Sequence, residues 1–347
     1  MTGPLTAWPV GGIGEVRAGD DLAALLAAAV RLEDGDVLAV SSKVVSKAMG
    51  LAVPGDTRDE AVLGQTVRVV AERLTPRGVT RIVESRSGPV LAAAGVDTSN
   101  VAPGTVLVLP PDPDAAARDL RAALAALTGR RLGVVVTDTM GRPWRDGQVD
   151  AALGVAGLLV TDDLRGGVDG YGNPLEVTVR ALADEVAALA DLVKGKLDGQ
   201  PAALVRGLAH LVTDDDGPGA AALLRASGAD WFRWGHVEAV RASVGVPPGT
   251  AGAPLVPVVP GSAAERLRRA VAVALASPHL PVEHLGVDLD PGPPPSALVA
   301  LPSDALDQQG LVAAGALAQR IAAVAIAEGL TVTLDLTPTA VAVRALP

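Results

Sequence analysis

Residues 132–145 read Leu132-Gly-Val-Val-Val136-Thr-Asp138-Thr139-Met-Gly-Arg142-Pro-Trp144-Arg145. The first part, 132–136, is short, unbroken and rich in β-branched residues, which predicts a buried strand. Asp138 follows almost directly, so we expect its carboxylate to emerge at the end of that strand. The stretch therefore predicts a strand with oxygen and guanidinium groups gathered at its end.

These groups suit the binding of a metal ion and a phosphate. Asp138 and Thr139 offer oxygen ligands of the kind that Mg²⁺ accepts. Arg142 and Arg145 follow closely and could hold phosphate oxygens through paired hydrogen bonds, with Trp144 between them as a shield. The alternative is an aspartate that caps a turn, with arginines in surface ion pairs. The concentration of these residue types favours a functional site.

The distribution of cysteine and histidine narrows the chemistry further. The chain has no cysteine, and its four histidines are His210, His236, His279 and His284. Thiol nucleophiles, disulfides and zinc-thiolate sites are excluded, and chemistry before residue 210 must proceed without imidazole. Hard cations with oxygen ligands remain, namely Mg²⁺, Mn²⁺ or Ca²⁺. The sequence has no P-loop, no Rossmann fingerprint and no Gly-x-Ser-x-Gly elbow.

Composition sets the class of protein. The 347 residues allow two domains, and 49% hydrophobic against 20% charged residues allow a sizeable core. A net charge of −10 argues against a nucleic-acid partner. The N-terminus lacks the basic and apolar regions of a signal peptide, and we expect no membrane span. The expected location is the cytoplasm.

Two other polar clusters are candidates. Residues 41–47 follow an expected strand over 37–40 and carry two lysines and three serines, which suits either a phosphate site or a solvated strand end. Asp97 and Asn100 could supply a metal ligand and an amide for a base or ribose. Their spacing alone favours an Asx turn without a ligand.

Patterning predicts a mixed α+β fold. We expect helices over 22–30, 56–75, 115–127, 178–193, 263–276 and 310–329, and strands over 37–40, 80–85, 132–136 and 202–205. Residues 88–95 predict a turn and a strand, and residues 107–114 predict a strand followed by a helix N-cap at Asp112 to Asp114. The predicted division is a catalytic domain over 1–226, a Pro/Gly-rich linker over 227–262 and a short C-terminal domain over 263–347.

The order of motifs over residues 10 to about 215 resembles the coenzyme F420-0:L-glutamate ligases, also called gamma-glutamyl ligases. The resemblance rests on these segments: Gly-Ile-Gly-Glu15, Gly19-Asp-Asp-Leu, Asp34-Gly-Asp36, Ser42-Lys-Val-Val-Ser-Lys47, Glu84-Ser85, Ala94-Gly-Val-Asp-Thr-Ser-Asn100, Leu109-Pro-Pro-Asp-Pro-Asp114, Asp138-Thr-Met-Gly-Arg-Pro-Trp-Arg145 and Ala183-Asp-Glu185.

The resemblance implies a homodimeric, GTP-dependent enzyme that adds L-glutamate to coenzyme F420-0 and extends a γ-linked tail. It implies Mg²⁺ or Mn²⁺, two per site, with K⁺ as a further candidate. Carried over by motif, Asp97 and Asp138 are metal ligands, and Thr139 serves a second metal ion. The GTP contacts are Gly12, Ile13, Gly14, Glu15, Ser42, Lys43, Lys47 and Asn100, and the catalytic residues are Lys47, Asp138, Arg142 and Arg145.

The implied reaction agrees with the residue chemistry. A substrate carboxylate attacks the γ-phosphate of GTP, and the glutamate amine displaces phosphate from the acyl phosphate, which needs no protein nucleophile. Lys196 stands where some relatives carry an acidic metal ligand, which puts the second ion in question. Some bacterial relatives also carry a flavin-binding nitroreductase-like domain. The tail here resembles a shortened remnant for which FMN is not expected.

Two rival functions stay open from the sequence. One is a bifunctional ligase with a flavin-dependent reductase domain. The other is a non-catalytic relative that binds nucleotide without turnover.

Overall fold

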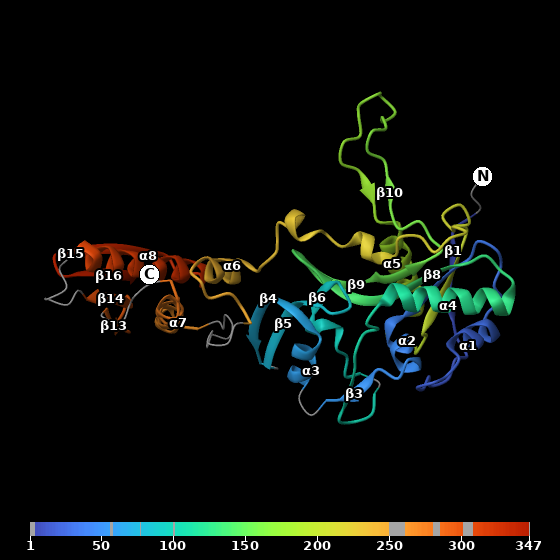
Figure 1. Ribbon diagram of the computed structural model, residues 1–347, viewed down its shortest axis with the longest axis horizontal. Helices are drawn as coiled ribbons and strands as arrows, with labels where there is room; N and C mark the ends of the chain where they lie inside the picture. The colour runs from blue at the N-terminus through green and yellow to red at the C-terminus, as the bar shows by residue number, and fades with distance from the viewer. Residues whose placement is uncertain are drawn as a thin grey trace. The chain divides into compact units, whose positions relative to one another are not determined.

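The computed structural model describes residues 4–55, 58–76, 78–99, 101–249, 261–279, 285–300 and 308–346. The chain forms two compact units. The first comprises residues up to 67 together with 84–229, and the second comprises 68–83 together with the chain from 230 onward. Both contain helices and sheets, which confirms the predicted α+β class (Figure 1).

A five-stranded sheet forms the centre of the first unit. Its strands, in spatial order, are β1 (Thr6–Val10), β12 (Ala202–Arg206), β2 (Val37–Ser41), β8 (Gly133–Arg142) and β9 (Arg145–Ala156). Only the pairing of β2 with β8 is parallel, and the other neighbours run antiparallel. The central strands are almost wholly valine, leucine and alanine because both faces of the sheet are covered.

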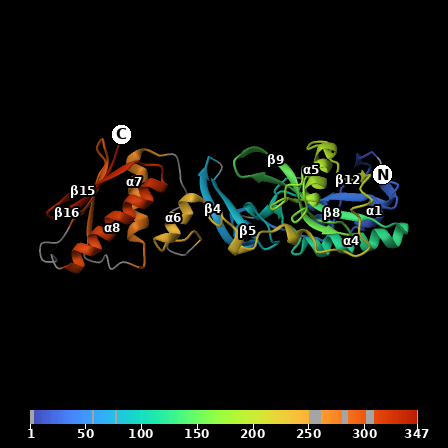
Figure 2. The same cartoon turned by 90° about the horizontal axis from the view of Figure 1, so that it is seen from above.

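Helices cover the two faces, as Figure 2 shows for α4 and α5. One face carries α1 (Leu22–Ala29), α2 (Ser42–Ala48) and α4 (Pro113–Thr128), and the other carries α5 (Leu182–Lys194). Because strand side chains alternate, Val134 and Val136 pack with the first group while Val135 packs against α5. This alternation also decides where the polar residues farther along β8 point.

The strand of residues 132–136 is real, but the prediction that it ends before Asp138 was wrong. β8 continues to Arg142 and turns directly into β9. Asp138 is paired with Ala151 inside the β8–β9 hairpin. The polar residues after Val136 do not by themselves predict a strand. They are extended because their backbone N–H and C=O groups pair with β9.

Three further predictions change in detail. The expected helix over 56–75 is only α3 (Arg58–Gly64), followed by β4 (Thr66–Thr75), since Thr-Val-Arg-Val-Val favours an extended chain. The segment after β2 forms the helix α2. Helix α5 begins at Leu182, so Asp184 lies in its first turn, where it accepts a hydrogen bond from Ala152 N–H at 2.9 Å.

The shorter elements of the first unit lie around this sheet. They are β3 (Ala52–Pro54), β6 (Val90–Ala92), η1 (Ala93–Gly95), β7 (Thr105–Leu107), β10 (Asp162–Asp163), β11 (Val179–Arg180), η2 (Ala220–Leu223) and η3 (Ser227–Ala229). Between β10 and β11 the chain forms an arm that projects from the rest of the unit (Figure 1).

The second unit contains a four-stranded antiparallel sheet. Its strands, in spatial order, are β13 (Gly286–Asp290), β14 (Ser296–Ala300), β16 (Ala340–Ala345) and β15 (Val332–Thr337). Helices α7 (Ala263–Leu275) and α8 (Gln308–Ala327) pack on it through alanine, valine and leucine. The unit also contains α6 (His236–Ser243), which lies in the predicted linker, and the β4–β5 hairpin, with β5 at Gly78–Ser85.

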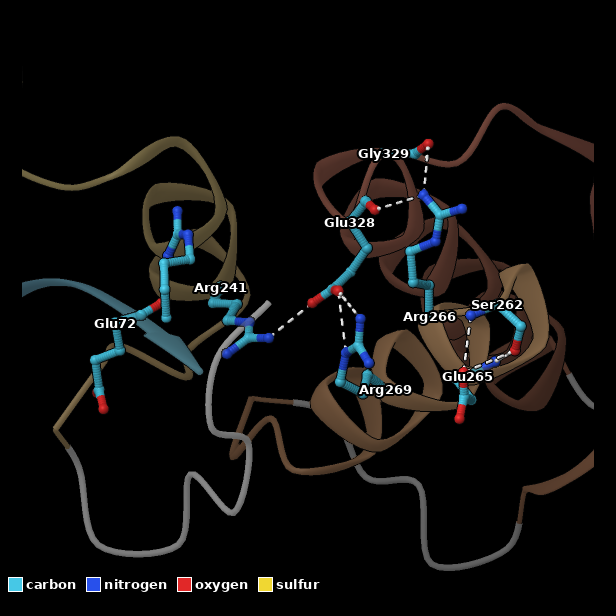
Figure 3. Close-up of polar contacts among 9 residues, drawn as sticks. Glu72, Arg241, Ser262, Glu265, Arg266, Arg269, Glu328 and Gly329 are labelled. Carbon is cyan, nitrogen blue, oxygen red and sulfur yellow. Dashed lines mark hydrogen bonds and ion pairs between the residues drawn. The ribbon is translucent and has the colours of Figure 1, made fainter. Parts of the chain in front are cut away.

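A buried ion cluster ties three helices of this unit together (Figure 3). Glu328 follows α8, and its side chain is 0% exposed. It accepts hydrogen bonds from Arg241 of α6 at 2.7 Å and from Arg269 of α7 at 2.8 and 3.1 Å. A carboxylate this deep in the protein is tolerated because two guanidinium groups compensate its charge.

One described helix is long and apolar enough to cross a membrane by length and composition, which we had not expected. It is the stretch Gln309–Ala327 of α8. Leu317, Ile321 and Val324 from this stretch are fully buried in the core of the second unit. Val312 and Ile326 of the same stretch are exposed at 72% and 59%, so packing accounts for only part of its apolar character, and the expected cytoplasmic location stays a prediction.

Candidate active site

Lysine is rare in this chain and is concentrated at one place. Of the 29 basic residues only four are lysine, and the other 25 are arginine. Each of the four contacts either a predicted site residue or the β8–β9 hairpin. The pairs are Lys43 with Asp97, Lys47 with Glu15, Lys194 with Asp150, and Lys196 with Thr139. Compact ammonium groups, rather than planar guanidinium forks, therefore surround this site.

Asp97 is held by an ammonium group and by its own turn. Lys43 Nζ lies 2.6 Å from its Oδ2, and Ser99 N–H donates to its Oδ1 at 2.7 Å. Burial acts to raise the pKa of Asp97, but the hydrogen bonds from Lys43 and Ser99 hold it below the ordinary value. Asp97 is thus both the Asx-turn residue that spacing suggested and a charged group oriented by Lys43.

The pKa of Asp138 is shifted in the opposite direction from that of Asp97. Burial is the main cause that raises the pKa of its carboxyl to about 6, and the negative charges of Asp150 and Asp97 add to the effect. The Thr139 N–H and the Ser42 hydroxyl donate to it and oppose the shift. A carboxylate buried near two others, without an ammonium of its own, is a favourable place for a cation.

Asp150 is the residue that sequence reasoning missed. Its side chain is 4% exposed, and its Oδ2 accepts from Lys194 Nζ at 2.6 Å and from the Thr137 hydroxyl at 2.9 Å. Its Oδ1 accepts from the Thr139 hydroxyl at 2.8 Å. Burial acts to raise the pKa of Asp150, but Lys194 and the two threonines keep it below the ordinary value. An acidic residue inside an apolar strand was the available signal, because a buried charge needs a partner.

Asp138 and Thr139 face opposite sides of the hairpin. Thr137, Thr139 and Asp150 share the α5 face, as their mutual hydrogen bonds show. Asp138 lies between the two threonines in the strand and therefore points to the α2 face, where Ser42 reaches it. Asp138 and Thr139, carried over as ligands of a first and a second metal ion, thus lie on opposite faces of β8.

The predicted glycine loop follows β1 and is connected to the carboxylates by α2. Glu15 pairs with Lys47, and a cleft of about 360 Å³ adjoins this loop. The cleft is lined by Gly14, Glu15, Asp20, Asp21, Ala24, Leu25 and Ala28. Gly12 and Gly14 are exposed, whereas Ile13 packs against the core, so the loop presents its backbone outward. The predicted contact Asn100 lies outside the described residues.

Arg142 and Arg145 form the tip of the hairpin. They are direct partners at the turn and both are exposed, as is Trp144 at 80%. Arg142 lies four residues beyond Asp138 along the extended strand, a rise of about 13 Å. The described contacts do not bring the two arginines onto the carboxylates.

The residues present fit a nucleotide-bound divalent cation. Among the described residues no three acidic or histidine side chains converge closely enough to hold a metal ion. Asp97 and Asp138 can supply two carboxylates on one face. Mg²⁺ is commonly held by one or two carboxylates, with phosphates and water as the remaining ligands. This donor set suits an ion that arrives with a nucleotide.

Comparisons with known proteins show the family of this chain. The family model for F420-0:gamma-glutamyl ligase matches residues 12–207, which contain the whole cluster. The coenzyme F420:L-glutamate ligase of Methanopyrus kandleri is 44% identical over 236 residues, covering 63% of this chain and 94% of that protein.

Two further relatives of the same name are similar. The protein from Archaeoglobus fulgidus is 42% identical over 216 residues (58% of this chain, 87% of that protein). The protein from Halobacterium salinarum is 40% identical over 249 residues (65% and 95%). Since the family model spans more than half of the chain, this protein belongs to the F420-0:gamma-glutamyl ligase family.

Proposed function

We propose that this protein is a GTP-dependent ligase that adds L-glutamate to coenzyme F420-0 through a γ-glutamyl linkage in coenzyme F420 biosynthesis, with release of GDP and phosphate. The observation that carries the proposal is the position of helix α2. Lys43 and Lys47 lie one turn apart on it, and they contact Asp97 and Glu15 respectively. One helix face thus links the glycine loop to the carboxylates.

The cation is proposed to bind at Asp97 and Asp138. When bound, Mg²⁺ or Mn²⁺ would offset the negative charge of the phosphoryl group during transfer. Lys43 and Lys47 lie beside this position and supply positive charge with little rearrangement. Backbone N–H groups of Gly12 and Gly14 are available to the phosphates because no side chain covers them.

The proposed chemistry has two steps. A carboxylate oxygen of the acceptor attacks the γ-phosphorus of GTP, and the bond from that phosphorus to the β-γ bridging oxygen breaks to release GDP. The glutamate amine then attacks the carbonyl carbon of the acyl phosphate, phosphate leaves, and the amine loses a proton. The protein's part in both steps is to position reactants and to stabilise charge.

A direct assay tests the proposal. The full-length protein is incubated with GTP, Mn²⁺, L-glutamate and coenzyme F420-0, and the products are followed by mass spectrometry and by GDP release. We expect one GDP for each glutamate added. If ATP replaces GTP without loss, the nucleotide assignment is wrong. If neither GDP nor a glutamylated product forms, the ligase proposal fails and a non-catalytic relative is the better description.

We also propose that the protein is a homodimer that uses the arm between β10 and β11. The arm exposes Val168 at 66%, Tyr171 at 96% and Val177 at 85%. Apolar side chains so exposed on a projecting arm favour a protein contact. Light scattering after size exclusion should give about twice the mass of one chain. The double variant Tyr171→Asp, Val177→Asp should shift the measured mass toward that of a single chain. A wild-type monomer would contradict this part.

A further inference from the structure

The two faces of the β8–β9 hairpin differ in charge. On the α2 face, Asp97 pairs with the ammonium group of Lys43 and Asp138 adds a second carboxylate, so these three side chains sum to −1. On the α5 face, Asp150 pairs with the ammonium group of Lys194, and the ammonium group of Lys196 donates to Thr139, so these three charged side chains sum to +1. A divalent cation is therefore attracted to the first face and repelled from the second.

The oxygen atoms on the α5 face are also already engaged. The Thr139 hydroxyl donates to Asp150 and accepts from Lys196 Nζ at 2.6 Å. Both carboxylate oxygens of Asp150 accept hydrogen bonds, from the two threonine hydroxyls and from Lys194. A cation that coordinated these oxygens would have to displace an ammonium group that already donates hydrogen bonds to them.

Lys194 and Lys196 differ in what they can do. Lys194 is buried at the end of α5 and forms an ion pair with Asp150. Lys196 lies on the following turn between Gly195 and Gly199, both at positive φ, and its side chain is exposed. Its hydrogen bond to Thr139 leaves the ammonium accessible to an incoming anion.

We propose that the site takes one divalent cation per nucleotide, on the Asp97–Asp138 face, and that Lys196 supplies positive charge on the opposite face in place of a second ion. This inference rests on the proposed function, since it assumes a nucleotide that brings the cation. Under this proposal, Lys196 determines how many divalent cations the site binds.

The test counts ions rather than turnover. Full-length protein is dialysed to equilibrium against MnCl₂ and GDP, and the ratio of Mn²⁺ to GDP retained is measured. We expect a ratio of one for the wild type and for Lys196→Arg, which keeps the charge. Lys196→Glu places a carboxylate beside Thr139 and Asp150, and we expect a ratio of two. Arg225→Glu, an exposed charge reversal elsewhere on the first unit, should keep the ratio of one.

The outcomes separate this inference from the function on which it rests. A wild-type ratio of two, or a ratio of one in Lys196→Glu, overturns the role of Lys196 and leaves the ligase proposal standing. Retention of GDP without Mn²⁺ overturns the cation site as well. No retention of GDP contradicts the nucleotide dependence itself. Far-UV circular dichroism of each variant checks that the folds are equal.

Discussion

Replacement of Asp138 by alanine should lower ligation of glutamate by at least about 10²–10³-fold, the usual cost of removing a charge-stabilising group from an active site. The variant should fold normally. Asp138 lies near Asp97 and Asp150, and its removal relieves repulsion among three carboxylates when no cation is bound. Steady-state assays with GTP and Mn²⁺, together with thermal unfolding without metal, measure the two effects.

A matched control lies on the same hairpin. Asp146 is exposed near the turn. Asp146→Ala also removes one carboxylate from the hairpin, but it leaves Asp97, Asp138 and Asp150 in place. It should retain near-wild-type turnover. Mn²⁺ and GDP should raise the unfolding temperature of the wild type and of Asp146→Ala, but not that of Asp138→Ala. Turnover of Asp138→Ala within a few-fold of the wild type would show that the metal role assigned to Asp138 is wrong.

Replacement of Glu328 by alanine should destabilise the second unit by about 3–5 kcal/mol, because it removes a buried carboxylate to which two largely buried guanidinium groups donate. Glu328 is fully buried, and the side chains of Arg241 and Arg269 are only 8% and 17% exposed. Loss of the carboxylate breaks the connection of α8 to both α6 and α7 (Figure 3). Hydrogen exchange of peptides from α7 and α8 reports on this unit directly.

Glu265 is the control for this prediction. It belongs to the capping box of α7 with Ser262, and it is exposed in the same region (Figure 3). Glu265→Ala should cost no more than about 1 kcal/mol, which is typical of a helix cap. Protection factors in α7 and α8 should fall strongly in Glu328→Ala and only slightly in Glu265→Ala. Equal behaviour of the two variants would contradict a structural role for the buried cluster.

The sequence predicted well those elements whose signals are local. The valine-rich strand before Asp138 and the helix capped by Asp112 were read correctly, because burial and capping leave a mark within a few residues. The helix predicted over 56–75 failed because its second half is extended and pairs with β5. Pairing between strands is decided by a partner that the local pattern does not contain.

The stretch from Leu132 to Arg145 by itself determined a buried strand. The full sequence excluded thiol chemistry, and the order of motifs over residues 10 to about 215 carried a resemblance that the family comparison confirmed. Only the tertiary structure decided that the strand continues past Asp138 and that Asp138 and Thr139 face opposite sides of it. The physical reason is that a pleat alternates side chains, and each face then meets a different helix. Asp150, Lys194 and Lys196 join the site only because β9 and α5 fold against β8.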